Sequence, residues 1–161
     1  MTNRFKNRSL CLKGILLLSV ASLLSACDGQ VVYHSFRSLP TTGWLRNDTL
    51  SFDVEVTDSL TYYKLFVEVR NRNNYPYQNL PLAIRYIAED SIASPTDTIQ
   101  LILADKDGIW KGDGWGGLYQ TAMAAGSIRI GRSGTYHFQV THALPDENLP
   151  GINDIGIRLE R

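Results

Sequence analysis

The residues best suited to bind a ligand are gathered in one glycine-rich stretch, DGIWKGDGWGGLYQ, at positions 107–120. It contains five glycines together with Trp110, Trp115 and Tyr119. Flat aromatic rings on a β-rich protein can stack on sugar rings, and clusters of exposed rings mark binding surfaces. Trp and Tyr also pack across loops while their polar atoms remain in water. The stretch therefore predicts either a surface for a protein partner or a glycan, or a turn that packs its own rings.

Three carboxylates in and around this stretch, Asp105, Asp107 and Asp113, raise the question of a bound calcium ion. Calcium prefers carboxylate and carbonyl oxygens in glycine-rich loops. The spacing of an EF-hand fails, because Ile109 and Gly116 occupy the fifth and twelfth positions counted from Asp105. Asp and Gly also shape ordinary turns. We expect a turn, with a structural calcium ion as the lesser alternative and no other cofactor.

The three histidines of the chain do not form a metal-binding pattern. His137 and His142 are an odd number of positions apart on one expected strand, so their side chains point to opposite faces. His34 lies in a different strand-like run, and the mature chain offers no cysteine pair or H-x-x-x-H spacing for zinc. A zinc site is therefore not expected.

Catalytic motifs are equally weak. Residues 131–134, Gly-Arg-Ser-Gly, faintly resemble a nucleophile elbow, but they lie between two expected strands, where a hairpin turn fits better. Asp53 and Glu55 share a strand face, as glycosidase carboxylates would, yet they also fit the solvent face of an amphipathic strand. We expect no catalytic residues. A hydrolase would need a cleft that gathers a histidine, a carboxylate and a hydroxyl group.

Short strands must position these residues, because apolar side chains recur with a period of two. Apolar residues alternate with polar ones in residues 50–56, and a similar alternation follows in 63–70. Such runs are typical of strands with one buried face, and the turn residues Asp58 and Ser59 between them predict a hairpin. Residues 120–125 could form one helical turn at most. Further strands are expected within residues 31–36, 80–87, 98–103, 128–130, 136–142 and 152–159.

About eight short strands joined by turns, with no sustained helical period, predict an all-β fold. We expect an antiparallel two-layer β-sandwich with a jelly-roll or immunoglobulin-like topology. The order of the strands within the sheets does not follow from the sequence.

The first 26 residues read as a signal peptide. Four basic residues and no acidic one accompany a short apolar run at 15–24, which is too short to cross a bilayer as a helix. The segment ends in Leu24-Ser25-Ala26-Cys27, which resembles the lipobox of bacterial lipoproteins. The resemblance implies removal of residues 1–26 and attachment of diacylglycerol and an N-acyl chain to Cys27. A short tether at 27–30 and a single domain at 31–161 would remain.

Loss of this signal changes the charge and cysteine content. The mature chain keeps 12 Lys and Arg against 16 Asp and Glu, a formal net charge of −4. No basic stripe is then available to neutralise phosphates, which argues against a nucleic-acid partner. Cys11 leaves with the signal, so no disulfide is expected although the compartment would permit one.

Several stretches together resemble the gliding-motility lipoprotein H (GldH) family of the Bacteroidota. The resemblance covers essentially the whole chain. It rests on the lipobox, Tyr33, Leu39-Pro40, Trp44, residues 51–70, the loop 71–80, Gly108-Ile109-Trp110-Lys111-Gly112-Asp113-Gly114, residues 134–138 and residues 149–160.

The resemblance implies a cell-envelope lipoprotein tied to the gliding apparatus, which works alongside the type IX secretion machinery. It implies no catalytic residue, and it carries over only Cys27, as the lipid attachment site. We expect a non-enzymatic domain that is anchored in the membrane, faces the periplasm rather than the cell surface, and contacts other envelope or motility proteins. A lipid-anchored carbohydrate-binding module is the alternative.

Overall fold

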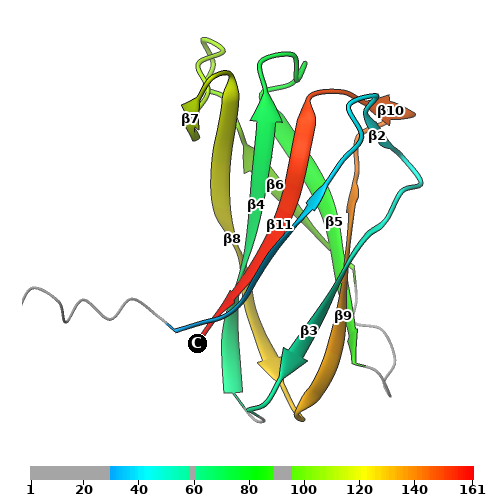
Figure 1. Cartoon of the computed structure of the whole chain (residues 1–161), viewed down its shortest axis with the longest axis vertical. Coiled ribbons are helices and arrows are strands. Elements are labelled where there is room, and N and C mark those ends of the chain that lie inside the picture. The colour runs from blue at the N-terminus through cyan, green and yellow to red at the C-terminus, as the bar shows by residue number, and fades with distance from the viewer. Residues whose placement is uncertain (1–29, 59–60, 89–95) are drawn as a thin grey trace, which may run out of the picture. The chain divides into compact units, whose positions relative to one another are not determined.

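Two antiparallel sheets face each other in the computed structural model, which describes residues 30–58, 61–88 and 96–161 (Figure 1). The signal peptide and Cys27 lie outside these residues. The five-stranded sheet has the order β1 (Val31–Ser38), β11 (Ile152–Glu160), β4 (Thr61–Arg72), β8 (Leu118–Ile130) and β7 (Asp113–Trp115). The four-stranded sheet has the order β3 (Leu50–Val56), β9 (Gly134–His142), β5 (Asn79–Ala88) and β6 (Asp97–Ile102). A small ladder joins β10 (Asn148–Leu149) to β2 (Trp44–Leu45).

The all-β prediction is confirmed, since every regular element of the described chain is a strand. Eight of these strands have six or more residues, in agreement with the expected number. The remaining three, β2, β7 and β10, have only two or three residues, too few to show an alternating pattern in the sequence.

The core lies between the two sheets and is built by the predicted alternation. On β3 the side chains of Phe52, Val54 and Val56 are buried while those between them are exposed. The buried face of β4 meets them with its own apolar side chains, including the fully buried Val67 and Val69. Each such side chain contributes about 1.5–3 kcal/mol when it leaves water. Burial of one face of each sheet therefore supplies the main force that holds the layers together.

The predicted hairpin between the runs at 50–56 and 63–70 is wrong. β3 pairs with β9, placing Phe52 opposite Phe138, whereas β4 pairs with β11 and β8 in the other sheet. Residues 131–134 likewise connect β8 to β9 across the two sheets and do not close a hairpin. Alternation shows only that one face of a strand is buried, and strands that face each other across a core satisfy it as well as paired neighbours do.

Residues 120–125 are also not helical, because they lie within β8, the longest strand. Alanine and methionine favour helix intrinsically, but only weakly. Here β4 pairs with β8 along its entire length, from Arg72↔Leu118 to Thr61↔Ile130. Tertiary pairing therefore overrides the local preference.

The register of the five-stranded sheet places Val31 and Trp115 near opposite ends of β4. Val31, the first strand residue after the tether, pairs with Glu160, which pairs with Lys64 on β4. Trp115 pairs with Leu118, which pairs with Arg72 at the other end of β4. Strands rise about 3.3 Å per residue, so the levels of Val31 and Trp115 differ by about 26 Å along β4.

Candidate binding surfaces

Trp115 is presented to solvent by a tight hairpin. We call β7, Gly116, Gly117 and Leu118 the Trp115 hairpin. Gly116 and Gly117 have φ angles of 63° and 81°, as a two-residue type I′ turn requires at both central positions. The Trp115 side chain is 94% exposed and makes no ring contact with another described residue. An indole group is thus exposed to water on a backbone turn of defined geometry.

Trp110 and Tyr119 are placed differently, although the sequence groups them with Trp115. Their ring centroids are 5.8 Å apart at an interplanar angle of 32°, and Trp110 also lies 6.4 Å from the ring of Tyr75. Trp110 is partly buried and packs against the core, held by a β-bridge to Ala104. The structure therefore brings Trp110 and Tyr119 together at the end of the sandwich and leaves Trp115 apart from them.

The carboxylate of Asp105 organises the turn that precedes Trp110. Its Oδ1 atom accepts hydrogen bonds from the backbone N–H groups of Asp107 and Ile109, each at 2.9 Å. The backbone N–H of Asp105 donates in turn to the carbonyl of Ile109 at 2.9 Å. Within residues 30–58, 61–88 and 96–161, no three His, Cys, Asp or Glu side chains come close enough to hold a metal ion.

A second polar arrangement lies on the outer face of the five-stranded sheet, around Glu68. Its side chain is nearly inaccessible, with 3% of the residue exposed, although it does not face the core. Arg158 donates from Nε to Oε1 at 2.7 Å, and Gln120 donates from Nε2 to Oε2 at 2.8 Å. His34 Nε2 lies 3.3 Å from the same Oε2. We call Glu68, Arg158, Gln120 and His34 the Glu68 cluster. They come from four strands, and the last three surround both oxygens of the buried Glu68 carboxylate.

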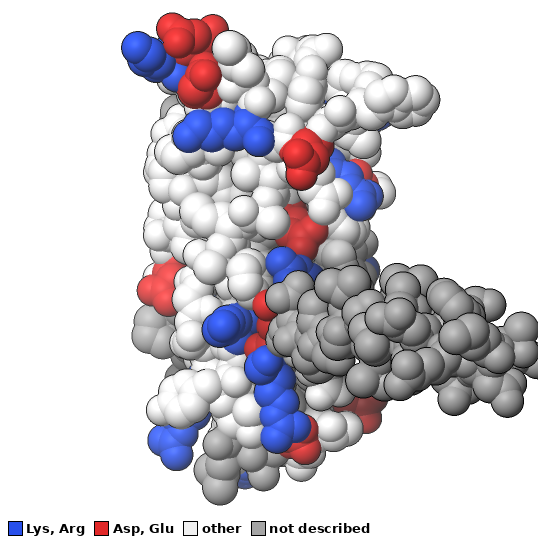
Figure 2. All heavy atoms as spheres, turned by 90° about the vertical axis from the view of Figure 1, so that its left-hand side faces the viewer, with Lys and Arg blue, Asp and Glu red and all other residues white. Residues whose placement is uncertain are grey.

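An aromatic ring and a guanidinium group lie beside the Glu68 cluster. Phe36 on β1 sits opposite Gly156 on β11, where an added Cβ atom would lie only 2.7 Å from the Phe36 ring. The guanidinium carbon of Arg70 lies 3.9 Å from the centroid of the same ring. Arg70 also donates from Nε to Gln120 at 2.8 Å, which joins the ring and the cluster into one network. Figure 2 shows the oppositely charged groups of this domain interspersed on one side.

Sequence reasoning missed the Glu68 cluster. The four side chains are separated by up to 124 positions, from His34 to Arg158, and only the strand register brings them together. One signal was available: Gly156 stands in the apolar run Ile155-Gly156-Ile157. A glycine inside a strand often marks a place where another group approaches the backbone closely.

Two histidines, His34 and His137, have carboxylate neighbours. His137 and His142 point to opposite faces of β9 as predicted, since His142 is buried and His137 Nδ1 lies 2.6 Å from Asp53 Oδ1 on the outer face. The pairs His137–Asp53 and His34–Glu68 supply two of the three groups that a hydrolase needs. In the described part of the chain, no hydroxyl group is hydrogen-bonded to either histidine.

His142 sits beneath the small β2–β10 ladder, against Trp44. Its ring centroid lies 5.2 Å from that of Trp44, and only 4% of the residue is exposed. Neither ring nitrogen has a well-formed hydrogen bond to a described residue. Burial lowers the pKa of His142 and outweighs the Trp44 main chain and the Asp146 carboxylate, which favour protonation. His142 is therefore a neutral core residue.

Comparison with known proteins places the chain among lipoproteins. Residues 31–159 match the family described as GldH lipoprotein. The "Gliding motility lipoprotein GldH" of Flavobacterium johnsoniae is 32% identical over 155 residues, which cover 92% of this chain and 95% of that relative. The "Gliding motility lipoprotein GldH homolog" of Christiangramia forsetii is 29% identical over 147 residues, covering 86% of this chain and 89% of that relative.

Solved structures resemble the chain only distantly. The C-terminal domain of EclA, titled a sugar-binding protein, matches with a TM-score of 0.36 and 12% identity, covering 86% of this chain and 80% of that one. Dimeric latent PorU from Porphyromonas gingivalis matches with a TM-score of 0.37 and 7% identity, covering 86% of this chain and 14% of that one. Scores this low carry no functional inference.

Proposed function

The chain belongs to the GldH lipoprotein family, and from this premise we propose that it is a non-enzymatic, lipid-anchored docking protein. It works in the cell envelope with the gliding-motility and type IX secretion apparatus. Its domain faces the periplasm, and the Trp115 hairpin contacts another envelope protein.

Anchoring through Cys27 fits the start of the domain. Cys27 precedes Val31 by four residues, which span at most about 14 Å when extended. No helix that could cross a membrane occurs in the part of the chain that the structure describes. One acyl chain gives only marginal attachment, whereas the diacylglyceryl and N-acyl chains together give a stable anchor.

The Cys27→Ala variant tests the anchor. We expect it to leave the membrane fraction, because no acyl chain can be attached at an alanine. Cell fractionation followed by immunoblotting measures the distribution. Recovery of the variant in membranes at the wild-type yield would contradict lipid anchoring at Cys27.

The exposure of Trp115 is the observation that carries the docking proposal. Tryptophan is enriched among the residues that dominate protein interfaces. Trp115 is 94% exposed on a two-residue hairpin, about 26 Å along β4 from the level where the tethered chain enters. A domain held to the bilayer near Val31 would thus present Trp115 away from its attachment point.

Site-specific photocrosslinking in living cells tests the docking surface. A photoreactive amino acid at position 115 should give a discrete crosslinked product with another envelope protein. Tyr62 provides the matched control, because it is an exposed aromatic residue, 65% accessible, near the tethered end of β4. Equal crosslinking from positions 62 and 115, or none from 115, would contradict docking through the hairpin.

Protease treatment of intact and permeabilised cells tests the orientation. A domain that faces the periplasm should resist added protease until the outer membrane is opened. Digestion in intact cells would instead place the domain on the cell surface.

The non-enzymatic part of the proposal is supported by the histidine environments. His34 and His137 each lie beside a carboxylate but have no hydrogen-bonded hydroxyl group within the described residues. Ser38, on the same strand as His34, donates to Asp154 at 2.6 Å. Both histidine–carboxylate pairs therefore fit structural contacts of a folded sheet, with an exposed carboxylate at Asp53 and a buried one at Glu68.

Carbohydrate binding is the second candidate function, because the exposed ring of Trp115 could also stack on a sugar. The rings of Trp110 and Tyr119 are tilted by 32°, and Trp115 contacts neither of them, so the three rings do not form one flat platform. A glycan array probed with wild-type protein and the Trp115→Ala variant distinguishes the two functions. Saturable glycan binding that disappears in the variant would replace protein docking as the proposed role.

A further inference from the structure

One long edge of the sandwich is open along β8. β7 pairs only with Leu118, Tyr119 and Gln120, and beyond Gln120 no described strand covers this side of β8 as far as Ile130 (Figure 1). On the four-stranded sheet, β6 is the edge strand on the same side and pairs only with β5. At the opposite edge, Arg37 on β1 donates from Nε to the carbonyl of Ser51 on β3 at 3.0 Å, which bridges the two sheets.

Backbone groups of β8 face this open edge. The residues that flank a two-residue turn form a hydrogen-bonded pair, and here they are Trp115 and Leu118. Leu118 therefore directs its N–H and C=O groups towards β7, and every second residue along β8 does the same. Beyond β7 these residues are Ala122 and Ala124. Edge strands are commonly protected by charged side chains, especially lysine, or by proline. Residues 121–130 contain no lysine or proline, and Arg129 is their only charged residue. One bulge, at Ala125, bends the strand without covering it.

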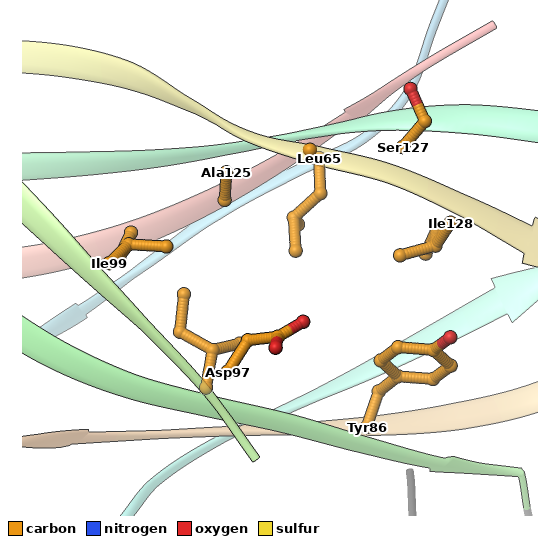
Figure 3. A pocket seen from close by; sticks show the side chains of 9 residues that line it. Leu65, Tyr86, Asp97, Ile99, Ala125, Ser127 and Ile128 are labelled. Carbon is orange, nitrogen blue, oxygen red and sulfur yellow. The ribbon is translucent and has the colours of Figure 1, made fainter. Parts of the chain in front are cut away.

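A cleft with both apolar and polar lining opens beside the same edge, between β8 and the strands β5 and β6 (Figure 3). It encloses about 140 Å³, and Leu65, Ile84, Ile99 and Ile128 form the apolar part of its lining. A cavity of roughly this volume accommodates one benzene ring. The cleft therefore has room for a single leucine or phenylalanine side chain. Figure 2 views this side of the molecule and shows an uncharged area that is bordered by charged groups above, below and beside it.

A carboxylate lies at the cleft in an inward-facing position. Asp97 is in phase with Ile99 and Leu101 on β6, and its carboxylate points into the cleft in Figure 3. No Lys, Arg or His of the described chain forms an ion pair with Asp97. The site thus combines unpaired backbone groups, space for one apolar side chain, and a negative charge without a cation.

We propose that the edge of β8 binds an extended segment of a partner protein as an added strand. An apolar side chain of this segment fills the cleft. A Lys or Arg two residues away pairs with Asp97, because residues i and i+2 of a strand point to the same side. This inference concerns a different surface from the Trp115 hairpin and does not depend on the function proposed for that hairpin.

A second copy of this chain fits the site less well than such a segment. Pairing of β8 with another β8 would turn the inward-facing residues of the second strand towards the cleft. These residues are Thr121, Met123, Gly126, Ile128 and Ile130, none of which is basic. Asp97 would then remain without a cation.

The test uses full-length lipoprotein in lipid nanodiscs and two pools of fluorescent hexapeptides. The first pool has the sequence Thr-X-Thr-Z-Thr-Val, with X as Leu, Ile, Val or Phe and Z as Lys or Arg. The second pool is identical except that Z is Asp or Glu. Fluorescence anisotropy measures binding of each pool to the wild type and to the Ala124→Pro, Ala124→Val and Asp97→Asn variants.

We expect saturable binding of the basic pool and at least about tenfold weaker binding of the acidic pool. Ala124→Pro removes an N–H group from the open edge and should weaken binding about tenfold or more, whereas Ala124→Val keeps that group and should bind like the wild type. Asp97→Asn should reduce the preference for the basic pool. Hydrogen exchange at Ala122 and Ala124 should slow when the basic pool is bound.

Any of four outcomes would overturn the proposal. The first is the absence of saturable binding of the basic pool by folded wild-type protein. The second is unchanged binding by Ala124→Pro. The third is stronger binding of both pools by Asp97→Asn, which would show that Asp97 repels added strands, as inward-pointing charges on edge strands can do. Concentration-dependent dimers of the wild type that Ala124→Pro abolishes would assign the edge to a second copy instead.

Discussion

Charged side chains are usually exposed and large apolar ones buried, but the Glu68 cluster and the Trp115 hairpin each contain an exception to this pattern. Glu68 is a charged residue that is only 3% exposed, and Trp115 is a large apolar residue that is 94% exposed. Both lie on the five-stranded sheet. They differ in what the chain itself provides for them.

The difference lies in how completely each side chain is satisfied. Hydrogen bonds from Arg158 and Gln120, together with nearby His34, satisfy the carboxylate of Glu68 from three neighbouring strands. Nothing in the described chain covers the ring of Trp115. A satisfied buried charge needs no external group and serves the fold, whereas an uncovered tryptophan on a defined backbone turn favours a role in binding. Substitutions in the two regions should therefore separate stability from partner binding.

The largest loss of stability is expected for Glu68→Ala. Removal of the carboxylate leaves Arg158 and Gln120 without their buried acceptor, and breaking a buried pair in this way costs about 3–5 kcal/mol. Because His34 and Arg158 remain partly accessible to water, we expect a loss of about 2–4 kcal/mol in the free energy of unfolding. Urea denaturation measures it. Glu55→Ala, an exposed carboxylate on β3, is the control and should change stability by less than about 0.5 kcal/mol; similar losses in both variants would contradict the comparison.

A smaller loss is expected for Gly156→Ala. The new Cβ atom would lie 2.7 Å from the ring of Phe36, which Arg70 covers from above. Overpacking of this kind costs about 1–3 kcal/mol. The double variant Gly156→Ala/Phe36→Ala should lose less than the sum of the two single variants, because the clash is absent without the ring. Additive losses in thermal or urea unfolding would show that the close approach is not the cause.

His142 sharpens the comparison, because it is a buried ionisable group that lacks the partners of Glu68. Its folded-state pKa lies below its ordinary value of 6.5, so the unfolded chain binds a proton more readily. Its contribution to stability is complete above about pH 6.5 and is lost as the pH falls towards the folded pKa. One proton limits the slope to about 1.4 kcal/mol per pH unit. Urea unfolding from pH 7.5 to 5 should show this decline in the wild type and a flatter profile in His142→Leu; identical profiles would refute the assignment.

The fold class could be predicted from the sequence because alternation reports which face of a strand is buried. Residues of β3 and β9 follow this rule closely, so their strands and buried faces were predicted correctly. The partners of a strand are not encoded locally, which is why the runs at 50–56 and 63–70 were assigned to a false hairpin. Of β8, only the end at 128–130 was expected as a strand; the alanine-rich part before it was missed, because only its pairing with β4 makes that segment extended.

For the binding surfaces too, the sequence indicated some residues, whereas their arrangement depends on tertiary structure. The glycine-rich stretch at 107–120 drew attention to Trp110, Trp115 and Tyr119 through composition alone. Which of the three is exposed depends on the bridge that fixes Trp110 and the turn that raises Trp115, and both are tertiary features. The Glu68 cluster depends on register across four strands and could not be assembled from one sequence.

Trp115→Ala should have the smallest effect on stability of all these changes. The side chain is almost fully exposed and packs against no other ring, so the free energy of unfolding should change by less than about 0.5 kcal/mol. A larger loss in urea denaturation would mean that the ring supports the hairpin and is not held free for a partner.

The function of the same variant in cells tests the central claim most directly. Strains that lack the gene are complemented with wild type, Trp115→Ala or the matched control Tyr62→Ala, and protein levels are equalised by immunoblotting. Secretion of a type IX cargo protein is then measured, with colony spreading in strains that spread. The account predicts that Trp115→Ala impairs these outputs at normal protein levels while Tyr62→Ala supports them. Full function of Trp115→Ala, or equal loss in both variants, would contradict docking through the Trp115 hairpin.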